Sequence, residues 1–399
     1  MKKRMGEITL LTIYPIDDKG EKIGGIEEII RSLVKYAPSD FNIEIVGITD
    51  NIKVGKWHNI TFNGKRIRFF PVLKVVDPNR ASIIPLTLRF SLVLFCLKDR
   101  IDFRDRIIIF HRLEPAYVLK NIEEKKILFV HGNIKNFQNR YCESRWRNFP
   151  KIYFLIEPFF IKDMKKIFVV SEEGTEYYKD RYPEYSDRFE FLPTWYDPKT
   201  FYKMEDIDKE RILGHYGIPD KGPIILFVGR LELPKDPFLL IESFYLINRT
   251  YEDAFLVLVG EGRLKNKVIQ KVKELGLLKR VIFLGKKTPF EVSQLINISN
   301  LMILSSAFEG MPRIALESLA CGLPVVATNV GEIHLIVKDG VSGKLVSSRD
   351  PSDLAKAAIE VISSPPSVFS CKKIVSHYSQ TKVLPHLYNK IKEIQGDEF

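Results

Sequence analysis

The chain has 399 residues, 45% of them hydrophobic and 28% charged, and its formal net charge is +11. One hydrophobic core rarely organises more than about 300 residues, so the length predicts two domains, and the composition excludes a disordered or fibrous protein. The charge indicates an anionic partner, which is a nucleic acid, an anionic lipid or a phosphorylated substrate. Net charge alone does not distinguish these three classes.

Two apolar stretches near the N-terminus are candidates for targeting or membrane segments. The first resembles a signal peptide, but Glu7 interrupts it and Pro15 ends it early, so it predicts a buried strand over residues 8–14. The second, residues 81–97, contains a proline and an arginine and is shorter than the roughly 20 residues of a spanning helix. It predicts a buried or interfacial helix.

Short runs of Val, Ile, Leu and Phe alternate with amphipathic stretches, and the pattern restarts after the polar stretch 197–210. Continuous apolar strands between helices are typical of parallel sheets covered on both faces. The sequence thus predicts two doubly wound α/β domains, 1–205 and 206–380, facing a central cleft where such sheets bind ligands. The predicted strands are 8–14, 41–48, 106–110, 126–130, 167–170, 224–228, 255–259, 281–284, 301–304 and 324–327, and the predicted helices of the second domain open near residues 236, 263, 288 and 312.

The last segment, 381–399, contains a predicted helix with Val383, Leu387, Ile391 and Ile394 on one side. Spacing alone leaves open whether it packs on its own domain or returns to the N-terminal domain.

The four cysteines, Cys96, Cys142, Cys321 and Cys371, form no C-x-x-C pair. Their scatter predicts neither disulfides nor a zinc site and fits a reducing cytoplasm.

A pair of glycines and a pair of cations each follow the first strand of a predicted domain. Gly24 and Gly25 precede a helix that runs to about residue 36, where backbone amides and the helix N-terminus suit a phosphate, although a tight turn explains them nearly as well. Arg230 and Lys235 follow the first strand of the second domain and together suit a departing diphosphate. The alternative for this pair is two solvated surface cations.

The most informative run covers residues 308–324. A helix starting at Pro312 would leave free amides and the Gly310-Met311 loop beside Glu309, where sugar hydroxyls can be held. Glu317 lies about a turn and a half into that helix among apolar residues, so its carboxylate needs a partner. The residues by themselves favour an arginine salt bridge over a ligand as that partner.

These motifs resemble the family 4 retaining glycosyltransferases, which have the two-Rossmann GT-B fold. The resemblance is close over residues 222–362 and looser in the N-terminal half, where it rests on Gly24-Gly25, His131-Gly132 and the strand end at 169–171. The matching motifs are FVGRL with Lys235, LVGEG at 258–262, VIFLG at 281–285, SSxxEGMP at 305–312, ESLACGLPVVA at 317–327 and DGVSG at 339–343.

The resemblance implies a role for each matched residue. Arg230 and Lys235 bind the donor diphosphate, and Glu317 binds the ribose hydroxyls. Glu309 holds the transferred sugar together with the backbone of Gly310, Met311, Pro312 and Arg313, and Gly24 with Gly25 closes over the phosphates. His131 lies beside the sugar near the reaction centre, although a lone histidine after a buried strand is usually a hydrogen-bonded surface residue.

The resemblance also implies the chemistry. A hexose leaves a UDP- or GDP-sugar with retention of configuration, and the departing diphosphate accepts the proton of the acceptor hydroxyl, so neither a cofactor nor a metal is expected. Asp206-Ile207-Asp208 spells the D-x-D of metal-dependent transferases, but its place in a charged stretch indicates a solvated helix start. The sequence departs from the family pattern at Trp195-Tyr196, and we assign no role to the charged stretch 110–115.

Residues 135–151 contain five bases against one acid, interleaved with aromatic side chains. This mixture suits an anionic lipid interface, nucleobase stacking or a plain basic outer helix. We expect a cytoplasmic protein at the inner face of the membrane, with a glycan or lipid-linked acceptor. The residues predicted to contact the membrane or acceptor are Arg140, Arg145, Trp146 and Arg147.

Two other classes remain. A GT-B epimerase or phosphorylase does not fit the 309–317 block with Arg230 and Lys235. A nucleic-acid-binding protein fits the net charge, but no recognised module appears, so we expect no nucleic-acid partner.

Overall fold

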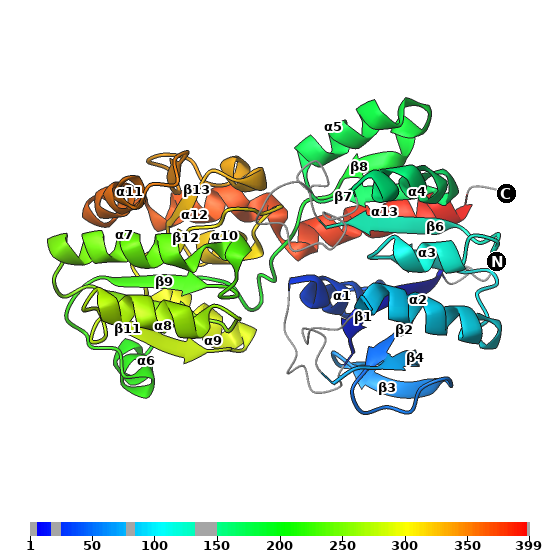
Figure 1. The fold of residues 1–399 in the computed structure, drawn as a ribbon, viewed down its shortest axis with the longest axis horizontal. Coiled ribbons are helices and arrows are strands. Elements are labelled where there is room, and N and C mark those ends of the chain that lie inside the picture. The colour runs from blue at the N-terminus through cyan, green and yellow to red at the C-terminus, as the bar shows by residue number, and fades with distance from the viewer. Residues whose placement is uncertain (1–5, 17–24, 77–83, 132–149, 397–399) are drawn as a thin grey trace. The chain divides into compact units, whose positions relative to one another are not determined.

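The computed structural model describes residues 6–16, 25–76, 84–131 and 150–396, which form two compact units (Figure 1). The first unit holds the described residues up to Leu192 together with those from Leu384 onward, and the second holds Pro193–Val383. The chain enters the second unit at Pro193, earlier than the boundary expected near residue 205.

The first unit is built on an eight-stranded sheet with the order β3-β4-β2-β1-β5-β6-β7-β8. Neighbouring strands are parallel except β3 and β4. All five strands predicted for this half are present, and their apolar runs are buried as a sheet covered on both faces requires. The strands are β1 (Gly6–Pro15), β2 (Phe41–Thr49), β3 (His58–Phe62), β4 (Lys65–Lys74), β5 (Ile107–Phe110), β6 (Lys126–Val130), β7 (Lys166–Val169) and β8 (Phe189–Phe191).

The hairpin of β3 and β4 was not predicted, although its turn has a clear signal. Asn63 and Gly64 connect the strands with φ angles of 53° and 79°. An Asn-Gly pair with positive φ at both positions is the favoured two-residue hairpin connection. The sequence therefore carried the information for this antiparallel edge.

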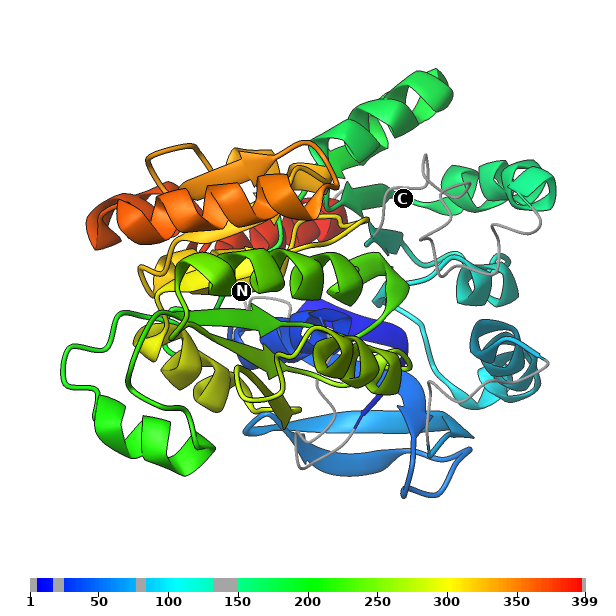
Figure 2. The ribbon, with the colours of Figure 1, turned by 60° about the vertical axis from the view of Figure 1, so that its left-hand side comes forward.

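Helices α2, α3 and α4 lie next to one another on the same side of the first sheet in both views (Figures 1 and 2). Phe90 of α2, Ala116 of α3, Phe160 of α4 and Tyr178 of α5 share one buried cluster with the strands. This cluster fixes the positions of the loops at the strand ends. The helices of the unit are α1 (Gly25–Lys35), α2 (Leu86–Leu97), α3 (Glu114–Val118), α4 (Pro150–Asp163) and α5 (Glu172–Arg181), with 3-10 turns η1 (Lys98–Arg100) and η4 (Pro183–Arg188).

The C-terminal helix α13 (Gln380–Gly396) packs on the first unit. The Tyr388 hydroxyl donates a 2.5 Å hydrogen bond to the Leu33 carbonyl of α1, and the Tyr388 ring lies 5.0 Å from that of Phe41. Lys392 pairs with Asp40 at 2.6 Å. The helix therefore leaves the second unit, the alternative that its spacing had left open.

The second unit contains a six-stranded, fully parallel sheet with the order β11-β10-β9-β12-β13-β14. Five of these strands were predicted, and the outer strand β14 was not. The strands are β9 (Ile224–Val228), β10 (Phe255–Val259), β11 (Val281–Gly285), β12 (Leu301–Leu304), β13 (Val325–Thr328) and β14 (Gly343–Val346). The helices are α6 (Lys209–Tyr216), α7 (Pro237–Thr250), α8 (Lys265–Glu274), α9 (Pro289–Ile298), α10 (Arg313–Ala320), α11 (Pro351–Ser363) and α12 (Val368–Val375), with η5 (Leu233–Lys235), η6 (Gly331–Leu335) and η7 (Ser376–Tyr378).

Local capping sets where these helices begin. Asp236 caps α7, and Thr288 caps α9 in a complete capping box with Glu291, both at predicted helix starts. The expected start at Pro312 requires a correction, because Pro312 has an extended ψ of 110° and is the residue before the first helical one. Helix α10 therefore begins at Arg313.

Trp195 and Tyr196, the departure from the family pattern, are both buried in the second unit. The Tyr196 amide donates to the Tyr378 carbonyl at 3.2 Å, and the Gln380 amide donates to the Tyr196 carbonyl at 2.9 Å. These residues fasten the start of the second unit to its end.

Candidate functional site

The order of the second sheet creates a switch point between β9 and β12. From β9 the chain proceeds to β10 and β11 on one side, and from β12 to β13 and β14 on the other. Loops that leave neighbouring parallel strands in opposite directions form the crevice where ligands of such sheets bind. The predicted cations Arg230 and Lys235 follow β9, and the predicted 305–312 loop follows β12. Two motifs distant in sequence thus share one edge.

Lys235 and Glu309 contact each other directly at this edge. The Lys235 ammonium forms an ion pair with the Glu309 carboxylate, which also accepts a 2.8 Å hydrogen bond from the Ser306 hydroxyl. Both side chains are largely but not fully buried. The structure thus brings together the residues predicted for the diphosphate and for the sugar. Arg230 is exposed on the same loop.

The two loops are also joined by their backbones. The Ser305 hydroxyl donates to the carbonyls of Lys235 and Asp236 at 2.8 and 2.9 Å, and the Ala307 amide donates to the Pro234 carbonyl at 2.8 Å. Asp236 has a φ of 39°, a left-handed conformation that is uncommon outside glycine. This turn sets the direction in which Lys235 leaves the loop.

Arg349, which sequence reasoning missed, connects these parts. Its guanidinium pairs with the Asp236 carboxylate and donates to the Ser306 carbonyl at 3.1 Å. One side chain therefore contacts both the turn after Lys235 and the loop that carries Glu309. No sequence pattern pointed to it, because Arg349 is distant in the chain and precedes an ordinary capped helix, α11.

We expect Arg349→Ala to lower the free energy of unfolding of the second unit by about 1 to 2 kcal/mol, because it removes hydrogen bonds made by a charged group. The same change frees both loops and is expected to lower catalytic turnover. Lys209→Ala is the matched control, since it removes an exposed pair with Asp220 and should cost less than about 0.5 kcal/mol. Chemical denaturation of both variants checks this, and equal effects would contradict the bridging role.

The Glu309-Gly310 turn is held by the loop after β13. The Glu332 amide donates to the Gly310 carbonyl at 2.9 Å. A Cβ on Gly331 would lie 2.2 Å from the Gly310 carbonyl oxygen, and Gly331 has a φ of 60°, so only glycine fits there. The close approach of these two loops fixes the backbone that precedes α10. This backbone was predicted to face the transferred sugar.

Glu317 forms an ion pair with Arg313, one turn earlier on α10, at 3.0 Å. Both side chains are largely buried, so each compensates the charge of the other. This is the arginine salt bridge that the residues alone had favoured. The partner is itself a predicted donor-site residue, and it is the first residue of α10, the helix that follows β12.

Glu232 is a second residue that the sequence did not indicate. Its buried carboxylate accepts hydrogen bonds from the Arg263 backbone amide at 2.9 Å and from the Arg263 guanidinium at 3.0 Å. These contacts tie the loop after β9 to the loop after β10. Glu232 therefore supports the segment between Arg230 and Lys235.

The first sheet has its own switch point, between β1 and β5. The segment after β1 leads into α1, whose first residue is Gly25, and His111 follows β5. His131, the predicted reaction-centre residue, follows the next strand, β6. His111 Nδ1 and His131 Nε2 lie 2.8 Å apart, which is a hydrogen bond between the two imidazoles. His111 had been given no role.

Burial keeps both imidazoles neutral. It lowers the pKa of His111 from 6.5 to about 3, helped by the Arg112 guanidinium. Burial also lowers the pKa of His131, and His111 and Arg112 add to that effect. Hydrogen bonding between neutral rings requires one to donate and the other to accept. His111 therefore restricts which tautomer His131 adopts.

The first unit is expected to lose stability as the pH falls from about 6.5 towards 3. In this pH range the unfolded chain binds protons at the two histidines and the folded protein does not. As the pH falls, each histidine therefore lowers the free energy of unfolding by up to about 1.4 kcal/mol per pH unit. Denaturant titrations at a series of pH values measure this slope. His111→Asn should flatten it, and an unchanged slope in that variant would contradict the assignment.

Several predicted residues lie outside the described part of the chain: Gly24, Arg140, Arg145, Trp146 and Arg147.

Within the described residues, no group of three or more His, Cys, Asp or Glu side chains is arranged to hold a metal ion. Asp208 of the D-x-D sequence is the N-cap of α6 and accepts from the Arg211 amide at 3.0 Å. It begins a helix, as its charged context indicated.

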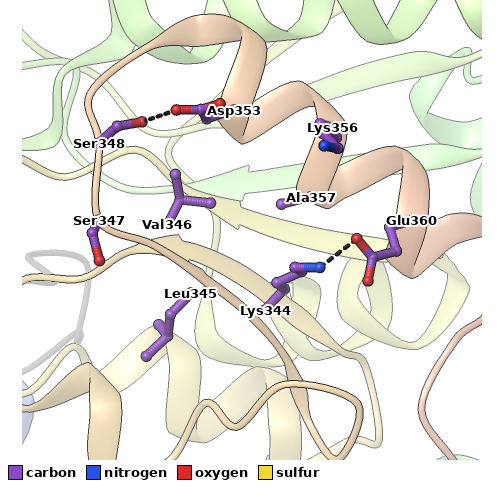
Figure 3. Close-up of a pocket in the computed structure, with 9 residues that line it drawn as sticks. All are labelled: Lys344, Leu345, Val346, Ser347, Ser348, Asp353, Lys356, Ala357 and Glu360. Carbon is purple, nitrogen blue, oxygen red and sulfur yellow. Dashed lines mark hydrogen bonds and ion pairs between the residues drawn. The ribbon is translucent and has the colours of Figure 1, made fainter.

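A pocket of about 360 Å³ lies between β14 and α11 (Figure 3). Three of its charged side chains have partners: Lys344 pairs with Glu360, and Asp353 accepts a hydrogen bond from the Ser348 hydroxyl. Strand β13 separates β14 from the switch point. The pocket is therefore distinct from the edge that carries Lys235 and Glu309.

Part of the chain is similar to a known protein family. Residues 208–376 match the family model described as glycosyl transferases group 1. The matched region is less than half of the chain and contains the β9–β12 switch point. The two parallel-sheet α/β units have the GT-B fold of solved glycosyltransferases.

Three individual proteins illustrate the likeness. An uncharacterized glycosyltransferase of Methanocaldococcus jannaschii is 27% identical over 266 residues, which are 64% of this chain and 64% of the relative. The sucrose-phosphate synthase of Thermosynechococcus elongatus superimposes with a TM-score of 0.78 at 18% identity, covering 98% of this chain and 100% of that one. HepE of Anabaena, solved in complex with UDP-glucose, superimposes with a TM-score of 0.70 at 17% identity, covering 97% of this chain and 98% of that one. The chain spans less than two thirds of the length of the curated relative.

Proposed function

We propose that this protein is a retaining glycosyltransferase that moves a hexose from a UDP- or GDP-sugar to a glycan or lipid-linked acceptor. The observation that carries the proposal is the meeting of Lys235 and Glu309 at the β9–β12 switch point. A cation and a carboxylate there suit the two ends of a nucleotide sugar, the diphosphate and the sugar hydroxyls.

In this proposal the Lys235 ammonium leaves Glu309 for the diphosphate when the donor binds. Glu309 then accepts hydrogen bonds from the hydroxyls of the transferred sugar, next to the backbone of Gly310 to Arg313. Arg230 adds a second cation, and Glu317 accepts from the ribose hydroxyls. The HepE complex with UDP-glucose supports a donor of this class.

The proposed reaction needs no strong base on the protein. The acceptor oxygen bonds to the anomeric carbon on the face from which the diphosphate departs, and the bond from that carbon to the diphosphate oxygen breaks. The acceptor proton passes to the departing oxygen, so charge develops where Lys235 and Arg230 stabilise it. We propose that the His111–His131 pair stays neutral and does not remove the proton.

A thermal-shift screen with UDP, GDP, ADP and their sugars tests the donor. A nucleotide at a hundred times its dissociation constant adds about 2.7 kcal/mol to the stability of the folded protein. We expect UDP or GDP to raise the melting temperature and ADP to do so less. A protein that none of the three nucleotides stabilises would not be the transferase proposed here.

A further inference from the structure

Helix α2 has an apolar outer surface as well as an apolar inner one. Phe90 and Leu94 are buried in the core, whereas Leu88, Leu92 and Phe95 are exposed, Leu92 by 57%. Arg89 is the one charged residue among the twelve of the helix. A surface helix normally presents a polar outer face, so a helix that is apolar all round indicates a further apolar partner.

Helix α4 repeats this arrangement. Phe160 and Ile161 are buried, and Leu155 and Phe159, which are four residues apart, are exposed by 71% each. Residues at this spacing lie on the same face of a helix. Two helices of the first unit therefore carry an outward apolar stripe.

Helix α3 connects the two stripes. Tyr117 of α3 is exposed, and its ring lies 6.1 Å from that of Phe160 on α4. Helices α2, α3 and α4 are neighbours on one side of the sheet in both views (Figures 1 and 2). We call their exposed apolar residues the apolar helix face, which consists of Leu88, Leu92, Phe95, Tyr117, Leu155 and Phe159.

Cations accompany two aromatic members of this face. The Lys98 ammonium lies 4.9 Å from the centre of the Phe95 ring, and the Lys120 ammonium lies 4.5 Å from that of Tyr117. Lys151 and Lys162 are exposed near the two ends of α4. Long basic side chains beside aromatic rings are typical of the boundary between a bilayer and water, where the stem lies in apolar surroundings and the charge reaches the headgroups.

We propose that the apolar helix face docks this protein on an anionic phospholipid bilayer. Burial of Leu and Phe side chains in the acyl boundary supplies the main attraction, and the lysines add attraction to the headgroups. A second copy of this chain is the less suitable occupant, because it would bring lysines against lysines and lysine is depleted in protein interfaces. Among the described residues, the structure contains no helix that could span a bilayer.

The proposal deepens the proposed function, since it places the N-terminal unit at the surface that would hold a lipid-linked acceptor. It differs from the sequence prediction, which assigned the membrane contact to residues 135–151. The six residues of the apolar helix face all lie on described helices.

Flotation with vesicles of phosphatidylcholine and phosphatidylglycerol tests the proposal. The natural protein should float with the mixed vesicles at low salt. The double variant Leu92→Glu with Phe159→Glu should partition at least about tenfold more weakly, since two apolar side chains are removed from the contact. Phe369→Glu is the matched control, because Phe369 on α12 is 72% exposed and has the Lys373 ammonium 5.9 Å from its ring, yet lies on the second unit. It should float like the natural protein.

Three results would overturn the proposal. They are a natural protein that stays at the bottom of the gradient, a double variant that floats unchanged, and an equal loss in the Phe369 control. A dimer in sedimentation that the double variant abolishes, without vesicle binding, would assign the face to a second copy. Nucleotide binding in the same samples, followed by thermal shift, separates failure of the docking from failure of the donor assignment.

Discussion

Lys235→Ala is expected to lower turnover by about 100-fold or more, since loss of one group that stabilises developing negative charge commonly costs that much. The variant removes the ammonium that pairs with Glu309 and leaves the Ser306 contact to that carboxylate in place. Turnover is measured as release of nucleoside diphosphate from the nucleotide sugar that stabilises the protein. Glu309→Ala is expected to lower turnover as well, with little change in nucleotide affinity.

Lys344→Ala is the matched control for this prediction. Lys344 also pairs with a glutamate, Glu360, on the second unit, but at the outer strand β14. It should retain nearly full turnover. Equal losses in the two lysine variants would show that removal of any such pair damages the unit, and would contradict a role for Lys235 at the diphosphate.

Glu317→Ala is expected to weaken the affinity for UDP by about 10- to 100-fold, because a hydrogen bond to a charged group contributes about 1.5 to 3 kcal/mol. The carboxylate is paired with Arg313 in the structure, so a purely structural role is the alternative. Titration calorimetry of UDP into the variant distinguishes them.

Arg313→Ala supplies the comparison. It breaks the same ion pair but keeps the carboxylate, and Arg313 itself was assigned a contact through its backbone. Its UDP affinity should fall much less than that of Glu317→Ala. Unchanged affinity in both variants, with an equal loss of stability, would make the pair structural.

The sequence predicted ten strands of the fold because buried parallel strands are uninterrupted apolar runs. It missed the edge strands β8 and β14, of which Lys344 and Leu345 in β14 are only partly buried, and the β3–β4 hairpin, whose signal was the turn at Asn63-Gly64. Edge strands face solvent on one side, so their composition is mixed and periodicity alone does not find them. The path of α13 was also unpredictable, because an apolar stripe does not identify the surface that it covers.

The sequence predicted the site residues that belong to short motifs, because such a motif indicates both the chemistry of a residue and its place in the fold. Lys235 and Glu309 lie in separate loops, and their meeting follows from the adjacency of β9 and β12. The supporting residues were not predictable. Arg349 and Glu232 act through contacts across the chain, and the pairing of His111 with His131 depends on the register of two neighbouring strands, β5 and β6.

The most direct test of the account is a crystal structure of the protein with UDP. We predict that the diphosphate lies at the carboxyl ends of β9 and β12, within hydrogen-bond distance of Arg230 and Lys235, and that the ion pair of Lys235 with Glu309 is broken. A diphosphate bound elsewhere, for example in the pocket between β14 and α11, with that ion pair intact, would contradict it.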